Sequence, residues 1–254
     1  MPTQAEKAAL FASLHVPGDP IVLVNIWDAG SAKTIAGAGA KALATGSHPM
    51  ADMFGVEDGE HMPMPELLFM VKQIVGATEL PVSHDIERGY GAAPADVERT
   101  CKAVISAGAI GVNMEDSLPD GSLRDISEQA DRYAAARSGM DGACPGTWLN
   151  ARTDVFAAMV DADPAAKLDA VAERSEAYVA AGADSLFVPF LRDLAMIEKV
   201  CAASVLPVNV MRIVGGPTIA EYAATGVARI SHGPTPRNAV MEALGHLAQD
   251  IYGT

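Results

Sequence analysis

Residues 95–117 read ADVERTCKAVISAGAIGVNMEDS, and this stretch contains the unit on which the fold prediction rests. An amphipathic helical segment runs to Ala107, and Gly108 then ends it in the left-handed conformation that glycine adopts without strain. The short apolar run 111–115 follows at once as a strand. A similar glycine exit recurs around three other positions, Gly39, Gly182 and Gly226. A helix that leads directly into a buried strand is typical of a parallel sheet.

Eight runs rich in Val, Ile and Leu fit strands of this kind. They cover residues 21–26, 42–46, 81–86, 111–115, 147–151, 185–188, 208–211 and 228–231. Amphipathic helical stretches lie between or after them, among them 65–75, 95–107, 126–137, 165–181 and 237–251. Eight strand–helix units in a chain of this length match a (β/α)8 TIM barrel. The Gly-rich phosphate turn of a doubly wound sheet is absent from the sequence, so we expect one barrel domain over residues 1–254.

Composition narrows the possible partners. The formal charge of -14 and the pI near 4.7 argue against nucleic acid or an anionic membrane surface, because both require a basic face. A small anionic substrate is still allowed, since a bound divalent cation reverses the local field. The three cysteines are far apart in the sequence and no long apolar segment is present. These features predict neither disulfides nor a membrane span, and they favour a reducing cytoplasm.

Polar residues, Asp116 among them, gather where the predicted strands end, which is the face that carries the active site in such barrels. Strand side chains alternate, so each of three pairs should point the same way: Asp85 with Glu87, Asn113 with Glu115, and Asn150 with Arg152. Three carboxylates and one arginine would then meet at a single mouth. Carboxylate oxygens with few histidines predict a site for Mg2+ or Mn2+ rather than for zinc.

Five stretches closely resemble motifs of the isocitrate lyase and phosphoenolpyruvate mutase superfamily, in the same order and over nearly the whole chain. They are NIWDAGSA at 25–32, GVEDG at 55–59, DIERGYG at 85–91, GVNMEDS at 111–117 and NARTD at 150–154. The pair formed by DIERGYG and GVNMEDS is the most specific of these. The chain is therefore identified as a member of this superfamily.

The resemblance implies a role for each matching residue. Asp85 would hold Mg2+, with Glu87 and Glu115 contributing directly or through water. Arg152 would pair with the substrate carboxylate, and Asp58 and Glu115 would complete the catalytic set. The remaining substrate-binding positions would be Trp27, Gly46, Ser47, His48 and Asn150, and relatives often have serine at the position of Gly46.

Each of these roles has a structural alternative. Asp58 lies in a Gly-rich turn, where aspartate is often only a turn former. Glu87 could support a metal ligand rather than bind the metal. His48 and His232 lie near the mouth without a clear counterpart in the family, and both are more readily explained as structural residues.

The loop after the fourth strand separates the possible reactions. Relatives that cleave isocitrate carry Lys-Lys-Cys-Gly-His there, and phosphonate mutases use a lysine and an asparagine, whereas this chain has SLPDGSLR at 117–124. Arg124 is its only cation, and the sixth strand ends in the apolar residues 187–190. The sequence therefore predicts a Mg2+-dependent lyase or decarboxylase that cleaves a C–C bond of an oxaloacetate-, malate- or methylisocitrate-like substrate through an enolate. The loop at 116–126 would be the lid.

Two other functions stay open. One is a C–P bond enzyme, either a phosphoenolpyruvate phosphonomutase or a phosphonopyruvate hydrolase. The other is a barrel that binds keto acids without catalysis. The resemblance also implies a homo-oligomer, dimer or tetramer, in which the C-terminal helix is exchanged between subunits. Apolar residues on that helix (Val240, Leu244 and Leu247) allow such exchange and equally allow packing against its own barrel.

Overall fold

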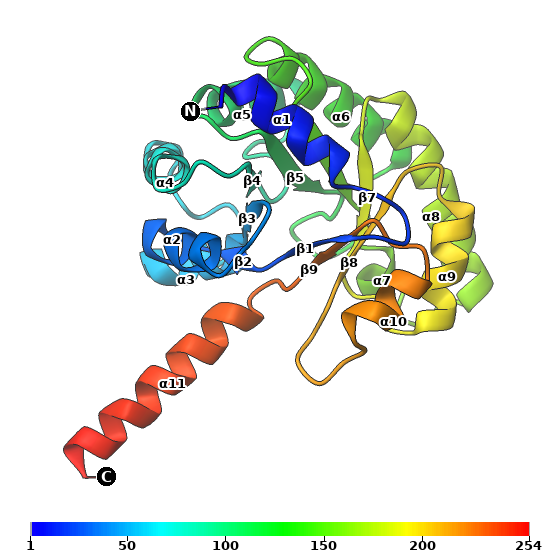
Figure 1. The fold of residues 1–254 in the computed structure, drawn as a ribbon. Helices are drawn as coiled ribbons and strands as arrows, with labels where there is room; N and C mark the ends of the chain where they lie inside the picture. The colour runs from blue at the N-terminus through cyan, green and yellow to red at the C-terminus, as the bar shows by residue number, and fades with distance from the viewer. Residues whose placement is uncertain (1, 254) are drawn as a thin grey trace.

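The computed structural model describes residues 2–253 and shows a ring of parallel strands surrounded by helices (Figure 1). The strands are β1 (Ile21–Leu23), β2 (Asn25–Ile26), β3 (Leu43–Thr45), β4 (Val82–Asp85), β5 (Gly111–Glu115), β6 (Trp148–Arg152), β7 (Ser185–Val188), β8 (Val208–Met211) and β9 (Arg229–Ser231). Their order in the sheet is β1-β9-β8-β7-β6-β5-β4-β3-β2. All of the strand pairs are parallel, so the predicted barrel is confirmed.

The ring closes through a first strand that is broken in two. β1 pairs with β9 and β2 pairs with β3, with Val24 between them, so residues 21–26 form one predicted strand divided between two neighbours. The Asn25 side chain spans the gap. Its amide nitrogen donates to the Thr45 carbonyl at 2.9 Å, and its oxygen accepts from the backbone N–H groups of His232 and Gly233, also at 2.9 Å. One side chain thus completes the hydrogen bonding that an unbroken strand would supply.

Helices form the outer layer. They are α1 (Gln4–Ser13), α2 (Ala29–Gly37), α3 (Ser47–Phe54), α4 (Met64–Gly76), α5 (Pro94–Ser106), α6 (Ile126–Asp141), α7 (Val155–Ala158), α8 (Pro164–Ala180), α9 (Leu194–Ala203), α10 (Ile219–Ala224) and α11 (Thr235–Tyr252). The five helical stretches that the sequence predicted lie within one to four residues of α4, α5, α6, α8 and α11. None of the helices in residues 2–253 is both long and apolar enough to cross a membrane.

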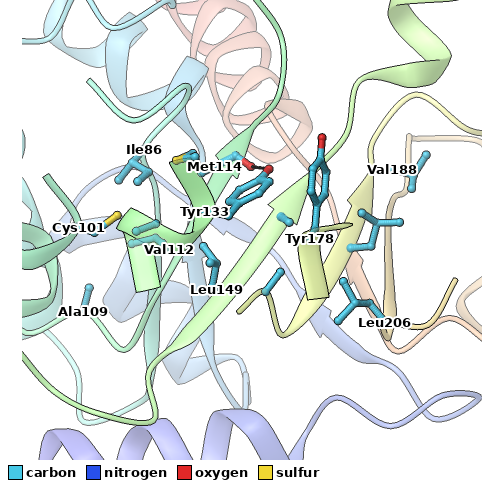
Figure 2. Close-up of a cluster of buried hydrophobic side chains, with 14 of the residues drawn as sticks. Ile86, Cys101, Ala109, Val112, Met114, Tyr133, Leu149, Tyr178, Val188 and Leu206 are labelled. Carbon is cyan, nitrogen blue, oxygen red and sulfur yellow. Dashed lines mark hydrogen bonds between the residues drawn. The ribbon is translucent and has the colours of Figure 1, made fainter. Parts of the chain in front are cut away.

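The main core lies between the strands and the helices. Figure 2 shows part of it, where Tyr133 of α6 and Tyr178 of α8 pack edge to face with ring centroids 4.6 Å apart. The Tyr133 hydroxyl donates to the Met114 carbonyl at 2.9 Å, which satisfies the polar end of a fully buried side chain. This packing fixes α6 and α8 against β5 and β6, the strands that carry most of the predicted site.

A second, smaller core closes the amino-terminal end of the barrel. Phe11 of α1 is fully buried among apolar side chains of the strands and their approaches, including Ile21, Leu23, Ala42, Ala44 and Ile110. His15 stacks on Trp148 with centroids 4.2 Å apart, and its Nδ1 donates to the Phe11 carbonyl at 2.8 Å. The N-terminal helix therefore seals one end of the barrel, and only the opposite end is left to admit a ligand.

The last helix differs from the others because it leaves the barrel. In Figure 1, α11 (red) points away from the ring, and none of its residues is buried. Its first turn is tied to the body by the ion pair between Arg237 and Asp52 of α3. Packing of α11 against its own barrel, one of the two arrangements that the sequence allowed, is thus not what the structure shows.

His15 gives a prediction about stability. Burial and then the nearby charge of Arg229 lower the pKa of His15 to about 3, against the opposing effect of the hydrogen bond to Phe11. The unfolded chain takes up this proton near pH 6.5, whereas the folded chain does not until about pH 3, so stability is lost as the pH falls through that window.

Acidification from pH 6.5 to 5 should cost the wild-type protein about 2 kcal/mol more than a His15→Phe variant, measured by urea denaturation at each pH. An Asn substitution at the exposed His246 serves as a control and should leave the pH profile unchanged. Parallel profiles for wild type and His15→Phe would contradict the prediction.

Candidate active site

A cavity of about 270 Å³ opens at the carboxyl ends of the strands. Its lining includes six of the residues singled out from the sequence: Gly46, Ser47, His48, Asp58, Asp85 and Arg152. The wall opposite the acids contains Phe187, Pro189, Phe190 and Met211. Residues from the ends of several strands therefore line one cavity.

Arg152 lies at the centre of the charged groups. Glu115 and Arg152 stand directly opposite each other in the β5–β6 register, and the Arg152 Nη1 is 2.7 Å from a Glu115 oxygen. The two oxygens of Asp154 accept from the Nε and Nη2 of Arg152 at 2.7 and 2.8 Å. Burial lowers the pKa of Arg152, but these two carboxylates outweigh it and the net shift is upward. The guanidinium is thus permanently charged and fixed in direction, with one side on the cavity.

Asp116 was predicted among the polar groups of the mouth, but the structure places it behind the mouth. Its carboxylate is fully buried and accepts from Arg174 and Tyr178 of α8, at 3.0 and 2.8 Å, and from the backbone N–H of Asp154 at 2.9 Å. The side chain at 116 leaves the strand on the outer side because Glu115 faces inward. Asp116 therefore positions Asp154, and through it Arg152.

Asp85 is the carboxylate at the cavity surface on β4. Its withdrawal from water raises its pKa, the charge of Arg152 opposes that rise, and the charge of Asp58 adds to it. Asp58 reaches the same cavity from the loop before α4. Two carboxylates from separate segments thus face one volume.

Glu87 lies beyond the end of β4, and its backbone has a left-handed φ of 52°, so strand alternation does not set its direction. It shares a small pocket with Asp85. One of its oxygens accepts from the backbone N–H groups of Gly59 and Glu60, and the other accepts from the Tyr90 hydroxyl at 3.0 Å. Burial, and then the charges of Asp58 and Asp85, raise the pKa of Glu87 to about 7. Glu87 therefore holds the loop that carries Asp58.

The segment 46–48 begins α3 and presents a helix N-terminus to the cavity. Gly46 is the N-cap residue and no side chain caps this helix. The N–H groups of a first helical turn have no partner within the helix, so they favour an anion. A Cβ at position 46 would lie 3.1 Å from Pro49 Cδ, which explains why glycine suits this turn. Residues 46–48, whose backbone donors the resemblance implied, thus lie at the mouth of the cavity.

Besides Glu87, three predicted site residues do not line this cavity. Trp27 is half-buried and packs on the main core. Asn150 is fully buried inside the barrel, where it donates to Asn113 at 2.8 Å and accepts from Ser185 at 2.6 Å. Glu115 is held by Arg152 and by the Ser117 hydroxyl. The structure also adds Arg229 of β9 to the lining, a residue that sequence analysis missed although it follows the inward spacing of Ser231.

The donor set fits a Mg2+ ion. Within residues 2–253 no group of three or more His, Cys, Asp or Glu side chains lies close enough to enclose a metal. Mg2+ does not require such a cage, because it keeps several waters and binds through one or two carboxylates. Asp85 offers a carboxylate at the cavity surface whose pKa is raised by burial, and the charge of Arg152 offsets that rise only in part. A divalent cation beside this carboxylate would favour its charged form.

The loop between β5 and α6 is folded back on itself. Ser117 and Leu123 form an isolated antiparallel β-bridge, and the Arg124 N–H donates to the Asp116 carbonyl at 2.9 Å. Arg124 pairs with Glu128 at 2.5 Å. No residue of this loop lines the cavity in the described chain. Arg124, the cation of this loop, thus pairs with Glu128 and does not line the cavity.

Comparison with known proteins identifies the family. The model of the phosphoenolpyruvate phosphomutase family matches residues 11–252, which is almost the entire chain. The chain belongs to this family. This membership agrees with the superfamily that the sequence motifs predicted, and with the barrel fold.

Relatives within the family have several activities. A protein of Burkholderia cenocepacia J2315, provisionally named a phosphonomutase, is 52% identical with a TM-score of 0.93 and covers 97% of this chain and 99% of its own. The 2-methylisocitrate lyase of Escherichia coli is 30% identical, over 77% of this chain and 70% of its own. An oxaloacetate decarboxylase of Rhodopseudomonas palustris is 30% identical, over 81% and 71%. Lyases, decarboxylases and mutases thus share this barrel.

The position of Asp116 leads to a testable outcome. An Asp116→Asn substitution leaves the buried Arg174 without its counter-charge, and breaking a buried ion pair on one side costs about 3–5 kcal/mol. We expect a loss of that size in urea denaturation, together with a weaker grip on Asp154. A matched Asp120→Asn substitution, on the exposed loop, should cost less than about 0.5 kcal/mol. Equal stability of the two variants would contradict the role assigned to Asp116.

Proposed function

We propose that this protein is a Mg2+-dependent lyase or decarboxylase that cleaves a C–C bond of a small 2-oxo or 2-hydroxy di- or tricarboxylate, with residues 1–254 acting as one catalytic domain. One observation carries the proposal. A single cavity combines a carboxylate suited to Mg2+ (Asp85), a fixed guanidinium (Arg152) and an uncapped helix N-terminus (residues 46–48). A 2-oxo acid presents matching groups, namely a chelating pair of oxygens and a carboxylate.

Each part of the site has a share in the reaction. Asp85 would hold the metal, with Asp58, Glu87 and Glu115 acting through bound water. Mg2+ in that position would supply Lewis acidity that offsets the charge developing on the 2-oxo oxygen as an enolate forms. Arg152 binds the carboxylate and offsets the same charge. It does so without reorganising, because Glu115 and Asp154 already fix it.

The apolar wall and the loop favour C–C over C–P chemistry. Phosphoryl transfer requires cations around the migrating group. Here Arg124 pairs with Glu128, and the end of β7 supplies Phe187, Pro189 and Phe190 to the cavity. The apolar side chains suit an alkyl or methylene group of the substrate and exclude water from a reactive enolate. The 52% identity to a protein provisionally named a phosphonomutase keeps the C–P reaction as the second candidate.

The proposal is tested by a substrate panel. Pyruvate release is measured from oxaloacetate, 2,3-dimethylmalate, methylisocitrate and phosphonopyruvate, each with Mg2+ and with EDTA. We expect turnover of at least one C–C substrate, which EDTA abolishes. Asp85→Ala should lower it by about a thousandfold, since the metal supplies several kcal/mol.

Glu57→Ala provides the matched control, because Glu57 is an exposed acid next to Asp58. It should retain nearly full activity. An Asp85→Ala protein as active as the wild type would refute the metal role. Inorganic phosphate released from phosphonopyruvate would favour the C–P reaction, and binding of oxalate without turnover of any substrate would favour the non-catalytic keto-acid binder.

The same proposal includes a homo-oligomer in a reducing cytoplasm. Val240, Leu244, Leu247 and Ile251 form one apolar stripe along α11, each more than half exposed. An 18-residue helix with no buried side chain gains little stability from its own barrel. We propose that α11 packs on a second copy of the chain, as the resemblance implied. The three free cysteines are consistent with the compartment.

Sedimentation analysis tests this arrangement. A Leu244→Asp/Leu247→Asp double variant should shift the protein from dimer or tetramer to monomer, because each subunit would bring two charges into the contact. Glu242→Ala/Gln249→Ala changes the opposite face of α11 and should leave the assembly intact. A wild-type protein that sediments as a monomer at all concentrations would rule out the exchange.

A further inference from the structure

Arg229 lies inside the barrel, at the inner surface of the active-site cavity. It is the first residue of β9, is 3% exposed, and stands between Asn209 of β8 and Ile21 of β1 in the strand register. It lines the same cavity as Arg152 and Asp85. The cavity therefore contacts two guanidinium groups, one at the strand ends and one deeper in the ring.

The two guanidinium groups differ in their partners. Arg152 has Glu115 and Asp154, both at 2.7 Å. Among the described residues, Arg229 has no carboxylate within 4.0 Å, and its Nε and Nη1 have no hydrogen-bond partner. A buried charge is costly unless it is paired and hydrogen-bonded. Arg229 is thus a cation that the protein around it leaves uncompensated.

A purely structural role does not explain this arrangement. Arg137 and Arg174, which do hold elements together, each donate at least three hydrogen bonds to the protein. Arg137 donates to the carbonyls of Gly182 and Thr147 and to Asp184, and Arg174 donates to Asp116, Tyr178 and the Arg124 carbonyl. The specific contact of Arg229 within the protein is with the ring of Phe11, whose centroid is 5.9 Å from Cζ. A cation–π contact leaves the N–H donors unused.

A second donor beside Arg229 is also unpaired. The Asn209 amide oxygen accepts from Ser231 at 3.2 Å, but its nitrogen has no partner among the described residues. Asn209 is fully buried and directly opposite Arg229. Burial lowers the pKa of Arg229 to about 10, against the opposing charge of Asp85, so the guanidinium still carries its charge at neutral pH. Donors from two adjacent strands therefore face inward with a net positive charge.

We propose that Arg229 is the specificity-determining residue of this site and binds a second anionic group of the substrate inside the barrel. The inference rests on the proposed function, in which Arg152 and the start of α3 bind the first carboxylate. It narrows the substrate to a compact dicarboxylate. The second carboxylate enters the ring, accepts from Arg229, and is supported by the amide of Asn209. A carboxylate that accepts from a guanidinium matches the geometry of its parallel N–H donors.

Two 2-hydroxy acids of nearly equal size test this assignment. (S)-Malate and (S)-2-hydroxybutyrate share the same chelating end and differ in a terminal carboxylate against a methyl group. Their dissociation constants are measured by calorimetry in the presence of Mg2+, with the full-length wild type and with Arg229→Met, which keeps the length of the side chain and removes its charge.

The wild type should bind malate about 10- to 100-fold more tightly than 2-hydroxybutyrate, the range expected for a charged hydrogen-bonded contact. Arg229→Met should lose this preference and bind 2-hydroxybutyrate within about threefold of the wild type. Arg229→Lys, which keeps the charge but loses the paired donors, should fall between them. A variant that weakens both ligands equally would overturn the assignment.

Thermal unfolding without ligand separates binding from a structural role. Replacement of an uncompensated buried charge by an apolar side chain of similar volume is neutral or stabilising. Arg229→Met should therefore unfold at the wild-type temperature or above it. If it does not fold, Arg229→Gln replaces it in the binding measurement. Failure of both variants to fold would overturn the proposal, because it would show that Arg229 maintains the barrel.

The same measurement separates this inference from the proposed function. Equal binding of malate and 2-hydroxybutyrate by the wild type would remove the role of Arg229 and leave the lyase proposal intact. Absence of binding by either ligand, with Mg2+ present, would remove both.

Discussion

The ion pairs of Arg152 are the interactions on which the rest of the site depends. Glu115 and Arg152 are directly opposite in the register of β5 and β6, and Asp154 grips the other edge of the guanidinium. These two carboxylates offset the cost of removing this charged group from water. Asp116 then ties the Asp154 backbone to α8. The direction of one cationic group is thus set by two strands, one loop and one outer helix.

Some charged groups inside the barrel have counter-charges within the protein and others do not, and this difference determines what the cavity can bind. Around Arg152 the protein supplies its own counter-charges. At Asp85, burial and then the charge of Asp58 raise the pKa of the carboxyl, and at Arg229 two buried nitrogens have no acceptor among the described residues. An environment that leaves one anion and one cation unsatisfied within the same volume is suited to a ligand that brings both a metal ion and an anionic group. Uncompensated groups are costly to folding, so their presence at a cavity is best explained by binding.

Most of the strands could be predicted because each is a short apolar run set off by glycine or proline. The strands at 111–115, 185–188 and 208–211 were predicted with the bounds that the structure shows. Strand ends also predicted the cavity, since the carboxyl end of every parallel strand lies on one face of the ring. The direction of the Glu87 side chain differs from the prediction because its left-handed φ interrupts the alternation of side chains along the strand. A local pattern of polar and apolar residues does not indicate such a backbone turn.

Other features depend on contacts that no local pattern contains. Strand alternation alone turns Asp116 away from the side that Glu115 faces, but its ion pair with Arg174, far along the chain, is not contained in any local pattern. Arg229 is surrounded by residues typical of any buried strand, so its missing partners became visible only with all of its neighbours in place. The apolar stripe of α11 was recognised in the sequence, but whether it packs on its own barrel depended on the direction in which the chain leaves β9.

The break at Val24 has a mechanical consequence. Elsewhere around the ring each strand pairs with neighbours on both sides, but here β1 pairs only with β9 and β2 only with β3, and the Asn25 side chain bridges the remaining gap. A ring is most compliant where its strand pairing is shortest, so local opening of the barrel concentrates beside Asn25. Because Asn25 also lines the cavity, a ligand that fills the cavity stabilises the barrel beside the break at Val24.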